Sequence, residues 1–441
     1  MSIHEKFNFH SAGELEEKAA ALNVNIPLQE DVSILKTPVK IGAFCSPNSL
    51  VTHPMECRDG SENGTPLDLT FRRYRRMAEG GSGIIWFEAT SVCDEGSSVS
   101  NQLMIKNENL SVYSKLVAET KKCASDKNGQ KNEPLCVIEL THSGRYSGKK
   151  PVIAYHNAYL DEKAKLNSDY PVITDAELER LEDIFVSKAI LAVEAGFDLI
   201  DVKCCHGYLI GELLSARTRE GKYGGSFENR IRFLLEVLDK ITDAVCGKAE
   251  ITVRTGAYDM IPYGWGMKQD GSFETDNEEP IHLLKELYKH GIKIVNLSAG
   301  NPYISPCIGR PFDKAMVGDP QAEEHPLVST ARIFDNTARI QQAVPEMKIV
   351  GIGYSWLRQY FGMAAAANIS QGRVTMAGLG RGSLAYPDFA NDLLYKGSLD
   401  PGKVCITCSL CSQLMRNGGP AGCMIHDTGI YKTYFDQKCR R

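Results

Sequence analysis

Four cysteines near the carboxyl end of the chain are spaced as ligands of a single metal group. The stretch reads CITCSLCSQLMRNGGPAGC and contains Cys405, Cys408, Cys411 and Cys423, with two, two and eleven residues between them. Three thiols at two-residue spacing can wrap one iron–sulfur cluster, and a distant fourth completes its coordination. A structural zinc site more often uses two separate cysteine pairs or cysteine with histidine. The spacing favours a cluster over zinc, and four unligated thiols would fit this polar tail poorly.

A second group of reactive side chains follows short apolar runs. These side chains are Glu139, His142 and Arg145 after one run, Lys203, His206 and Tyr208 after the next, Arg254 after a third, and Asn301 and Tyr303 after a fourth. Two later runs end in glycine-rich turns at Gly353 and at Gly380 with Arg381. Backbone N–H groups in such turns can hold a phosphate, although a glycine after a strand is as often only a turn.

The elements that must position these residues are eight apolar runs separated by helical stretches. The runs span 49–55, 83–89, 134–140, 197–203, 250–255, 292–298, 347–353 and 373–380. Most are continuously apolar, as expected for parallel strands buried on both faces. Eight strand–helix units favour a closed (β/α)8 TIM barrel over an open doubly wound sheet. The carboxyl ends of barrel strands share one face, where active sites are built.

Local signals outside the strands agree with this architecture. Thr174 and Glu177 form a plausible capping box for a helix that Gly196 ends. A long loop over 256–279 follows the fifth strand and should lie at the active-site face. We predict an N-terminal arm over 1–36, a barrel over 37–400 and a cluster-binding segment over 401–441.

Composition excludes several classes of protein. A formal net charge of −5 argues against a nucleic-acid surface, and 43% hydrophobic residues are ordinary for a globular protein. The start, MSIHEKFNFHSAGELEEKAA, lacks the apolar core of a signal peptide. No run of about 18 apolar residues predicts a membrane span. Fourteen cysteines without an export signal are expected to be reduced thiols, so we predict a cytoplasmic protein.

Several motifs in register resemble the Old Yellow Enzyme, or NADH:flavin oxidoreductase, family. The stretch HGYLIGELLSARTREGKYGGSFENRIRF over 206–233 resembles the family signature, and EAT at 88–90, ELTHSGR at 139–145 and GLGR at 378–381 follow the same order. The resemblance covers roughly residues 37–400 and implies FMN. The cysteine run is similar to that of the branch containing 2,4-dienoyl-CoA reductase, 2-enoate reductases and trimethylamine dehydrogenase, where it holds a 4Fe–4S cluster.

This resemblance implies a catalytic set of four residues. Tyr208 matches the proton donor to the α-carbon of an activated alkene, whose β-carbon takes hydride from FMN. Lys203 and His206 match the pair that binds the substrate carbonyl, although the family's first member is usually histidine. Tyr303 is a second candidate for a proton donor or a gate. The alternatives are a packed tyrosine at Tyr208 and an ion pair between Lys203 and Glu139.

The resemblance also implies a set of flavin contacts. The expected contacts are Pro54, Met55 and Glu56 on the first strand, Ala89 under the ring, Glu139 and Arg254 at the pyrimidine edge, and Gly353, Gly380 and Arg381 at the phosphate. Glu139 replaces the usual glutamine; an ionised carboxylate only accepts hydrogen bonds, so it should lower the flavin potential. Glu56 replaces the usual threonine or cysteine. Cys57 is one residue out of register, so we expect no covalent flavin. His142 and Arg145 either face the flavin dimethylbenzene edge or are structural.

Three functions compete. The first is an ene-reductase acting on an α,β-unsaturated carbonyl compound, which is an enone, an enoate or an enoyl thioester. The second is an amine dehydrogenase or N-demethylase, for which Tyr263 and Trp265 could contribute to an aromatic cage, although Lys203 would repel a cation. The third is an electron-transfer or structural flavoprotein without a substrate of its own, and an intact Tyr208 argues against it.

The source of electrons is a separate question. Many members of this branch continue with a nucleotide-binding domain, whereas GIGYSW and GLGRGS here do not read G-x-G-x-x-G. We therefore expect a separate redox protein as the electron donor, with NADH or NADPH as a direct or indirect source, or a purely structural cluster. A homo-oligomer is left open.

Overall fold

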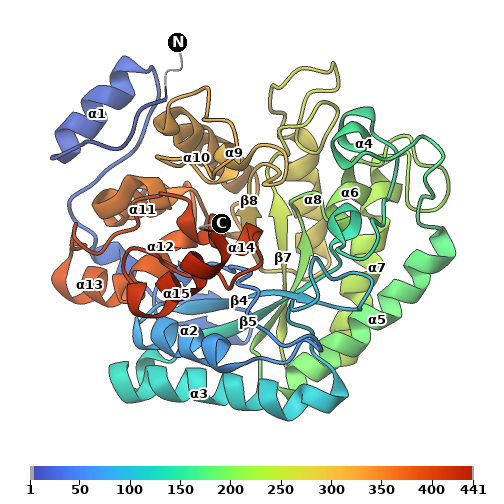
Figure 1. Cartoon of the computed structure of the whole chain (residues 1–441), viewed down its shortest axis with the longest axis horizontal. Coiled ribbons are helices and arrows are strands. Elements are labelled where there is room, and N and C mark those ends of the chain that lie inside the picture. Colours follow the sequence, from blue (N-terminus) through green and yellow to red (C-terminus); the bar gives the residue numbers. More distant parts are fainter. Residues whose placement is uncertain (1–3, 440–441) are drawn as a thin grey trace.

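Eight short strands curve around one axis, and each pairs in parallel with two neighbours (Figure 1). In the computed structural model, which describes residues 4–439, they close in the order β10–β3–β4–β5–β6–β7–β8–β9. The strands are β3 (Leu50–Thr52), β4 (Ile84–Ser91), β5 (Leu135–Thr141), β6 (Leu199–Cys204), β7 (Glu250–Gly256), β8 (Ile294–Ser298), β9 (Lys348–Gly351) and β10 (Met376–Leu379). Each predicted apolar run contains or overlaps one of them, so the predicted (β/α)8 barrel is confirmed.

One layer of helices surrounds the barrel. Following the strands in turn are α2 (Asp68–Glu79), α3 (Leu110–Asn128), α5 (Asp175–Glu194), α7 (Phe227–Val245), α8 (Glu278–Lys289), α10 (Pro326–Ala343), α11 (Phe361–Ser370) and α13 (Phe389–Lys396). The predicted capping box begins α5: Thr174 Oγ1 accepts from the Glu177 N–H at 3.2 Å, and the Glu177 carboxylate accepts from the Thr174 N–H at 2.7 Å. The predicted long loop lies between β7 and α8.

Further helices and 3-10 turns lie outside the eight strand–helix units. The helices are α1 (Ala12–Ala21), α4 (Ala158–Ala164), α6 (Leu209–Ser215), α9 (Pro306–Gly309), α12 (Arg381–Ala385), α14 (Leu410–Arg416) and α15 (Thr428–Cys439). The 3-10 turns are η1 (Ser33–Lys36), η2 (Asn107–Asn109), η3 (Gln130–Asn132), η4 (Gly144–Tyr146) and η5 (Tyr354–Tyr360). No helix within residues 4–439 is both long and apolar enough to cross a membrane.

An antiparallel hairpin, not predicted, closes the amino-terminal end of the barrel. It consists of β1 (Val39–Ile41) and β2 (Phe44–Ser46). Val39, Ile41 and Phe44 pack against apolar residues at the starts of the barrel strands, such as Ile84 and Leu135. The hairpin therefore seals the bottom of the barrel with apolar contacts.

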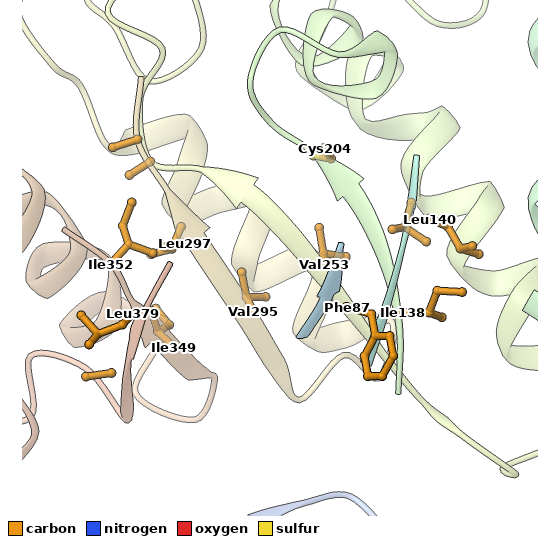
Figure 2. Close-up of a cluster of buried hydrophobic side chains, with 14 of the residues drawn as sticks. Phe87, Ile138, Leu140, Cys204, Val253, Val295, Leu297, Ile349, Ile352 and Leu379 are labelled. Carbon is orange, nitrogen blue, oxygen red and sulfur yellow. The ribbon is translucent and has the colours of Figure 1, made fainter. Parts of the chain in front are cut away.

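Alternation along the strands separates the core from the site. Outward-facing residues such as Ile138, Val253 and Leu297 are buried beneath the helices, and Figure 2 labels these residues of β5, β7 and β8. Inward-facing positions alternate with these. They are apolar near the hairpin and become polar toward the carboxyl ends, as in the β5 series that runs from Val137 to Glu139. The interior of the barrel is therefore apolar near the hairpin and polar at the carboxyl ends of the strands.

The outer core gives a stability prediction. Leu297 is fully buried, so Leu297→Ala should lower the free energy of unfolding by about 2–5 kcal/mol, the usual loss for a buried leucine. Leu67 is 47% exposed, and Leu67→Ala should change it by about 0.5 kcal/mol or less. Denaturant titration of the cofactor-loaded proteins measures both. Equal losses would contradict this assignment of the core.

Candidate active site

A cavity of about 470 Å³ opens at the carboxyl ends of the strands. Its volume is in the usual range for small-molecule sites, about 300–1,000 Å³. The residues predicted for substrate and flavin all line it: Pro54, Met55, Glu56, Ala89, Glu139, Lys203, His206, Tyr208, Arg254, Tyr303, Gly353, Gly380 and Arg381. Residues distant in sequence are therefore brought together, while their individual roles stay predictions.

Three charged side chains form a continuous ion-pair network at the centre of the cavity. Glu139 on β5 contacts Lys203 Nζ on β6 through Oε1 at 3.0 Å and Arg254 Nη1 on β7 through Oε2 at 3.0 Å. Burial alone would raise the pKa of Glu139, but the two cations hold it below its ordinary value. The ion pair between Lys203 and Glu139, which the sequence analysis gave as an alternative, is therefore present. Lys203 nevertheless lines the cavity.

This network, hereafter the triad Glu139–Lys203–Arg254, carries one net positive charge. A further carboxyl group, Asp201, pairs with Glu139 in the strand register and accepts a hydrogen bond from Trp86 Nε1 at 2.9 Å. Burial first, and then Glu139, raise the pKa of Asp201 well above its usual range, which disfavours the charged form of this group. Two cations therefore face one carboxylate, and the cavity suits a ligand on which negative charge develops.

Two tyrosine hydroxyls meet within the cavity. Tyr208, which is 3% exposed, lies with its hydroxyl 3.0 Å from that of Tyr303, which is 45% exposed. Tyr303 stacks on Tyr146 with ring centroids 3.8 Å apart, and Asn301 Nδ2 donates to the Tyr146 hydroxyl at 2.9 Å. Burial raises the pKa of Tyr208 well above its usual range, so its hydroxyl keeps its proton.

His206 and Lys203 supply further hydrogen-bonding groups next to Tyr208. The His206 Nε2 atom lies 2.7 Å from Ser298 Oγ, and the residue adopts a left-handed φ of +64°. Burial, with help from Arg254 and Lys203, lowers the pKa of His206 well below its ordinary value, so the ring is neutral. Lys203 Nζ lies 4.4 Å from the centroid of the Tyr208 ring.

A group of glycines and arginines that line the cavity is suited to an anion. Gly353 adopts a left-handed φ of +94°, and Gly380 approaches so closely that a Cβ there would lie 3.0 Å from Met55 Sδ. The arginines are Arg381 and Arg310. Burial, and then the charge of Arg381, lower the pKa of Arg310 to about 10. Two neighbouring guanidinium groups require a counter-ion, and a phosphate meets this requirement.

The chain passes a test of fit for a flavin mononucleotide. Arg254 Nε and Arg310 Nε are buried and have no hydrogen-bond partner. Buried N–H groups are normally paired, so two unpaired ones on residues that line one cavity indicate a ligand with several acceptors. The isoalloxazine pyrimidine edge and the phosphate of FMN provide such acceptors.

The cysteine-rich segment adjoins the same cavity. Cys411, on α14, lines it directly. Arg310 Nη1 donates to Ser412 Oγ at 2.6 Å, and Arg58 Nη1 donates to the Met415 carbonyl at 3.1 Å. The Ala421 N–H donates to the Cys57 carbonyl at 2.8 Å. These bonds fix the segment against the residues that line the first strand end.

The local backbone orients N–H groups toward the cysteine sulfurs. Thr407 and Ser409 lie between the first three cysteines and have left-handed φ values of +48° and +59°. The Thr407 N–H donates to Cys405 Sγ at 3.4 Å, and the His426 N–H donates to Cys423 Sγ at 3.3 Å. All four cysteines are unpaired thiols of intermediate exposure. Such N–H···S bonds are among the interactions that tune iron–sulfur clusters.

Several residues considered from the sequence lie outside the cavity. Arg145 forms buried ion pairs with Asp161 and Glu212, so it is structural. Cys57 is buried, and its Sγ donates to the Met55 carbonyl at 3.1 Å. His142 likewise does not line the cavity.

The predicted aromatic cage does not form at the cavity. Trp265 is buried in its loop, where Nε1 donates to the Gly256 carbonyl at 2.8 Å, and Tyr263 is 53% exposed. Neither residue lines the cavity. Packing within the long loop holds Trp265 away from the cavity, and the composition of the loop does not reveal this packing.

Other residues that line the cavity were not predicted. Arg310, Ser355 and Arg58 lie outside the strands, whereas Ser298 ends β8 but was given no role. No local signal in the sequence marks Arg310 as a buried loop cation. Tyr146 directly follows the ELTHSGR motif and could have been found by its proximity.

Comparison with known proteins identifies the family. The model of the NADH:flavin oxidoreductase / NADH oxidase family matches residues 35–397. An NADPH dehydrogenase of Clostridium acetobutylicum is 34% identical over 266 residues, which are 58% of this chain and 71% of that protein.

Two solved structures share the fold at low identity. A 2-naphthoyl-CoA reductase, solved with 2-naphthoyl-CoA, superposes with a TM-score of 0.70 and 20% identity over 90% of this chain and 57% of its own. Histamine dehydrogenase from Rhizobium sp. 4-9 superposes with a TM-score of 0.65 and 20% identity over 90% of this chain and 52% of its own. The chain thus spans little more than half the length of either. By its family match, it belongs to the NADH:flavin oxidoreductase / NADH oxidase family and is a flavoprotein oxidoreductase.

Proposed function

We infer that this protein is an FMN- and 4Fe–4S-dependent ene-reductase that reduces the C=C bond of an α,β-unsaturated carbonyl compound. The observation that carries the proposal is a protonated tyrosine, Tyr208, beside two carbonyl-binding side chains, Lys203 and His206, in one cavity. When bound there, FMN supplies the hydride. A 2-naphthoyl-CoA reductase has the same fold, which supports the substrate class at the level of analogy only.

The chain's own residues can stabilise charge and deliver a proton. Lys203 and His206 bind the substrate carbonyl oxygen, and the net positive charge of the triad favours the enolate that develops there. Tyr208 keeps its proton because burial raises its pKa, and the hydroxyl protonates the α-carbon as a general acid. Tyr303, 3.0 Å away, is the second candidate donor.

The barrel, residues 37–400, is proposed to hold FMN, with 1–36 as an arm and 401–441 as the cluster segment. Glu139 and Arg254 contact the pyrimidine edge, and Ala89 lies under the ring. Pro54, Met55 and Glu56 flank it. Gly353, Gly380 and Arg381, joined by Arg310, bind the phosphate. All these residues line one cavity.

The ligands proposed for the cluster are Cys405, Cys408, Cys411 and Cys423. Their two-residue spacings and a distant fourth member support a cluster over zinc.

Electron supply and location remain proposals. Cys411 shares the cavity with the flavin residues, so a cluster held there can pass electrons to the flavin. A separate redox protein is the proposed donor, with NADH or NADPH as its direct or indirect source. A cytoplasmic location stays a prediction from the sequence.

The alternative is an amine dehydrogenase or N-demethylase, and histamine dehydrogenase shares the fold. A cationic amine would bind over an aromatic face. The ammonium of Lys203 already lies over the Tyr208 ring, and the triad adds a net positive charge. Both features favour a carbonyl oxygen over a cation.

The tyrosine assignment can be tested by substitution. Tyr208→Phe should slow alkene reduction by about 10²–10⁴-fold, the usual contribution of a positioned general acid, and leave flavin reduction nearly unchanged. Rapid-mixing anaerobic spectroscopy measures both half-reactions. Tyr263→Phe, in the exposed loop, is the matched control and should change neither. If Tyr303→Phe slows alkene reduction and Tyr208→Phe does not, Tyr303 is the donor.

The triad predicts a shift in flavin potential. Glu139→Gln removes a negative charge beside the flavin, so the midpoint potential should rise by about 30 mV or more, equivalent to about 1.4 kcal/mol for two electrons. Anaerobic spectroelectrochemistry measures it. Glu278→Gln makes the same charge change at an exposed site on α8 and should leave the potential unchanged. A fall in potential in Glu139→Gln would contradict the assignment.

The cluster predicts a metal content. Protein prepared without oxygen should contain one FMN and about four iron and four sulfide per chain. The Cys408→Ser variant should lose iron and should not turn over with a protein electron donor. After chemical reduction, the same variant should still reduce substrate in a single turnover. Cys246→Ser, at an exposed cysteine outside the segment, should retain both iron and turnover. Stoichiometric zinc without iron would rule out the cluster.

A further inference from the structure

A second group of metal-ligating side chains lies outside the active-site cavity, where the loop after β4 packs on the end of β5. Cys93, Glu95 and His142 each place one ligand atom within 4.8 Å of the others. None of the three lines the cavity, and the proposed reaction uses none of them. These residues therefore need an explanation of their own.

Backbone hydrogen bonds hold this loop against the imidazole. The Val92 N–H donates to the Thr141 carbonyl at 3.0 Å, and the Ser143 N–H donates to the Gly96 carbonyl at 2.7 Å. A Cβ on Gly96 would lie 2.6 Å from His142 Cδ2 and 3.1 Å from Nε2. The absence of a side chain at Gly96 lets the loop lie directly on the Nε2 side of the ring.

His142 presents an unsatisfied ligand atom to this loop. The residue is 1% exposed, and Nε2 is buried without a hydrogen-bond partner. Buried side-chain nitrogens are normally paired, so an unpaired one indicates a missing ligand. Burial also lowers the pKa of His142 to about 4, which leaves the ring neutral, the form that binds metals.

We propose that Cys93, Glu95 and His142 form a binding site for a divalent cation of the zinc type. Thiolate, imidazole and carboxylate are the three usual protein ligands of zinc, and three of them leave a fourth position for water. Glu95 is exposed and Cys93 is half-buried, so that position faces solvent. The site is separate from Cys405–Cys423 in sequence and in the fold.

Binding requires specific proton movements. Burial raises the pKa of the Cys93 thiol to about 11, so the metal displaces one proton from sulfur to solvent. His142 Nδ1 accepts from the Gly144 N–H at 3.1 Å, whereas coordination through Nε2 requires a proton on Nδ1. The carbonyl of His142 itself can accept that proton's hydrogen bond. Lys106, paired with Asp94 at 3.2 Å, and Lys188 are nearby cations that weaken the affinity.

An occupied site would brace the rim of the active-site cavity. The His142 carbonyl accepts from the N–H of Leu209, the residue after Tyr208, at 3.2 Å. In the same loop as Cys93, Ser98 Oγ donates to Glu56 at 2.7 Å. A metal joining the two segments would therefore stabilise the walls next to Tyr208 and Glu56 without touching the substrate.

Zinc titration of the protein loaded with FMN and its cluster tests the proposal. Calorimetry should give one Zn²⁺ per chain, and Cys93→Ser and Glu95→Gln should each weaken binding about tenfold or more. Cys246→Ser, at an exposed cysteine elsewhere, should bind as the wild type does. Zinc should also raise the melting temperature of the wild type but not of Cys93→Ser.

X-ray absorption of the bound zinc identifies the ligands independently of affinity. One sulfur with nitrogen and oxygen ligands would support the site. Four sulfurs would place the zinc at Cys405–Cys423 and overturn the proposal. No binding by the wild type, or equal binding by Cys93→Ser and Cys246→Ser, would overturn it as well.

Discussion

Three charged side chains are buried at the ends of β5, β6 and β7, and one carboxylate must compensate two cations. The rest of the active site depends on this charge balance. Glu139 bridges Lys203 and Arg254, with both contacts at 3.0 Å. Removing one member of a buried pair typically costs about 3–5 kcal/mol, so each residue constrains the other two. The carboxylate compensates only one of the cations. The remaining positive charge favours ligands on which negative charge develops.

The barrel accommodates these buried charges only at the carboxyl ends of its strands. Side chains alternate along each strand. Those that point outward are apolar and pack against the helices, and those that point inward near the β1–β2 hairpin are apolar as well. Toward the carboxyl ends, inward positions hold Asp201, Glu139, Lys203 and Arg254, each with a charged or hydrogen-bonding neighbour. Cys411 at the same mouth brings the proposed electron source next to the flavin residues. The residues proposed for the reaction, the cofactor and electron entry thus line one cavity.

Sequence predicted the strands well because each is a short apolar run that the parallel barrel buries on both sides. It missed β1 and β2, whose three-residue length gives no periodicity to detect. Residues at strand ends, such as Tyr208 and Arg254, could be placed in one cavity because barrel topology brings those ends together. Arg310 could not, because its loop reaches the cavity through tertiary packing. The same packing buries Trp265 away from the cavity, and the unpaired Nε2 of His142 is visible only in three dimensions.

The most direct measurement of the central claim is anaerobic reoxidation of the photoreduced protein. Enones, enoates, enoyl thioesters and methylated amines are each mixed with it, and flavin absorbance and products are followed. The account predicts that at least one α,β-unsaturated carbonyl compound restores oxidised flavin and leaves as its saturated product. Failure of every such compound, together with bleaching of the oxidised protein by a methylated amine, would contradict it.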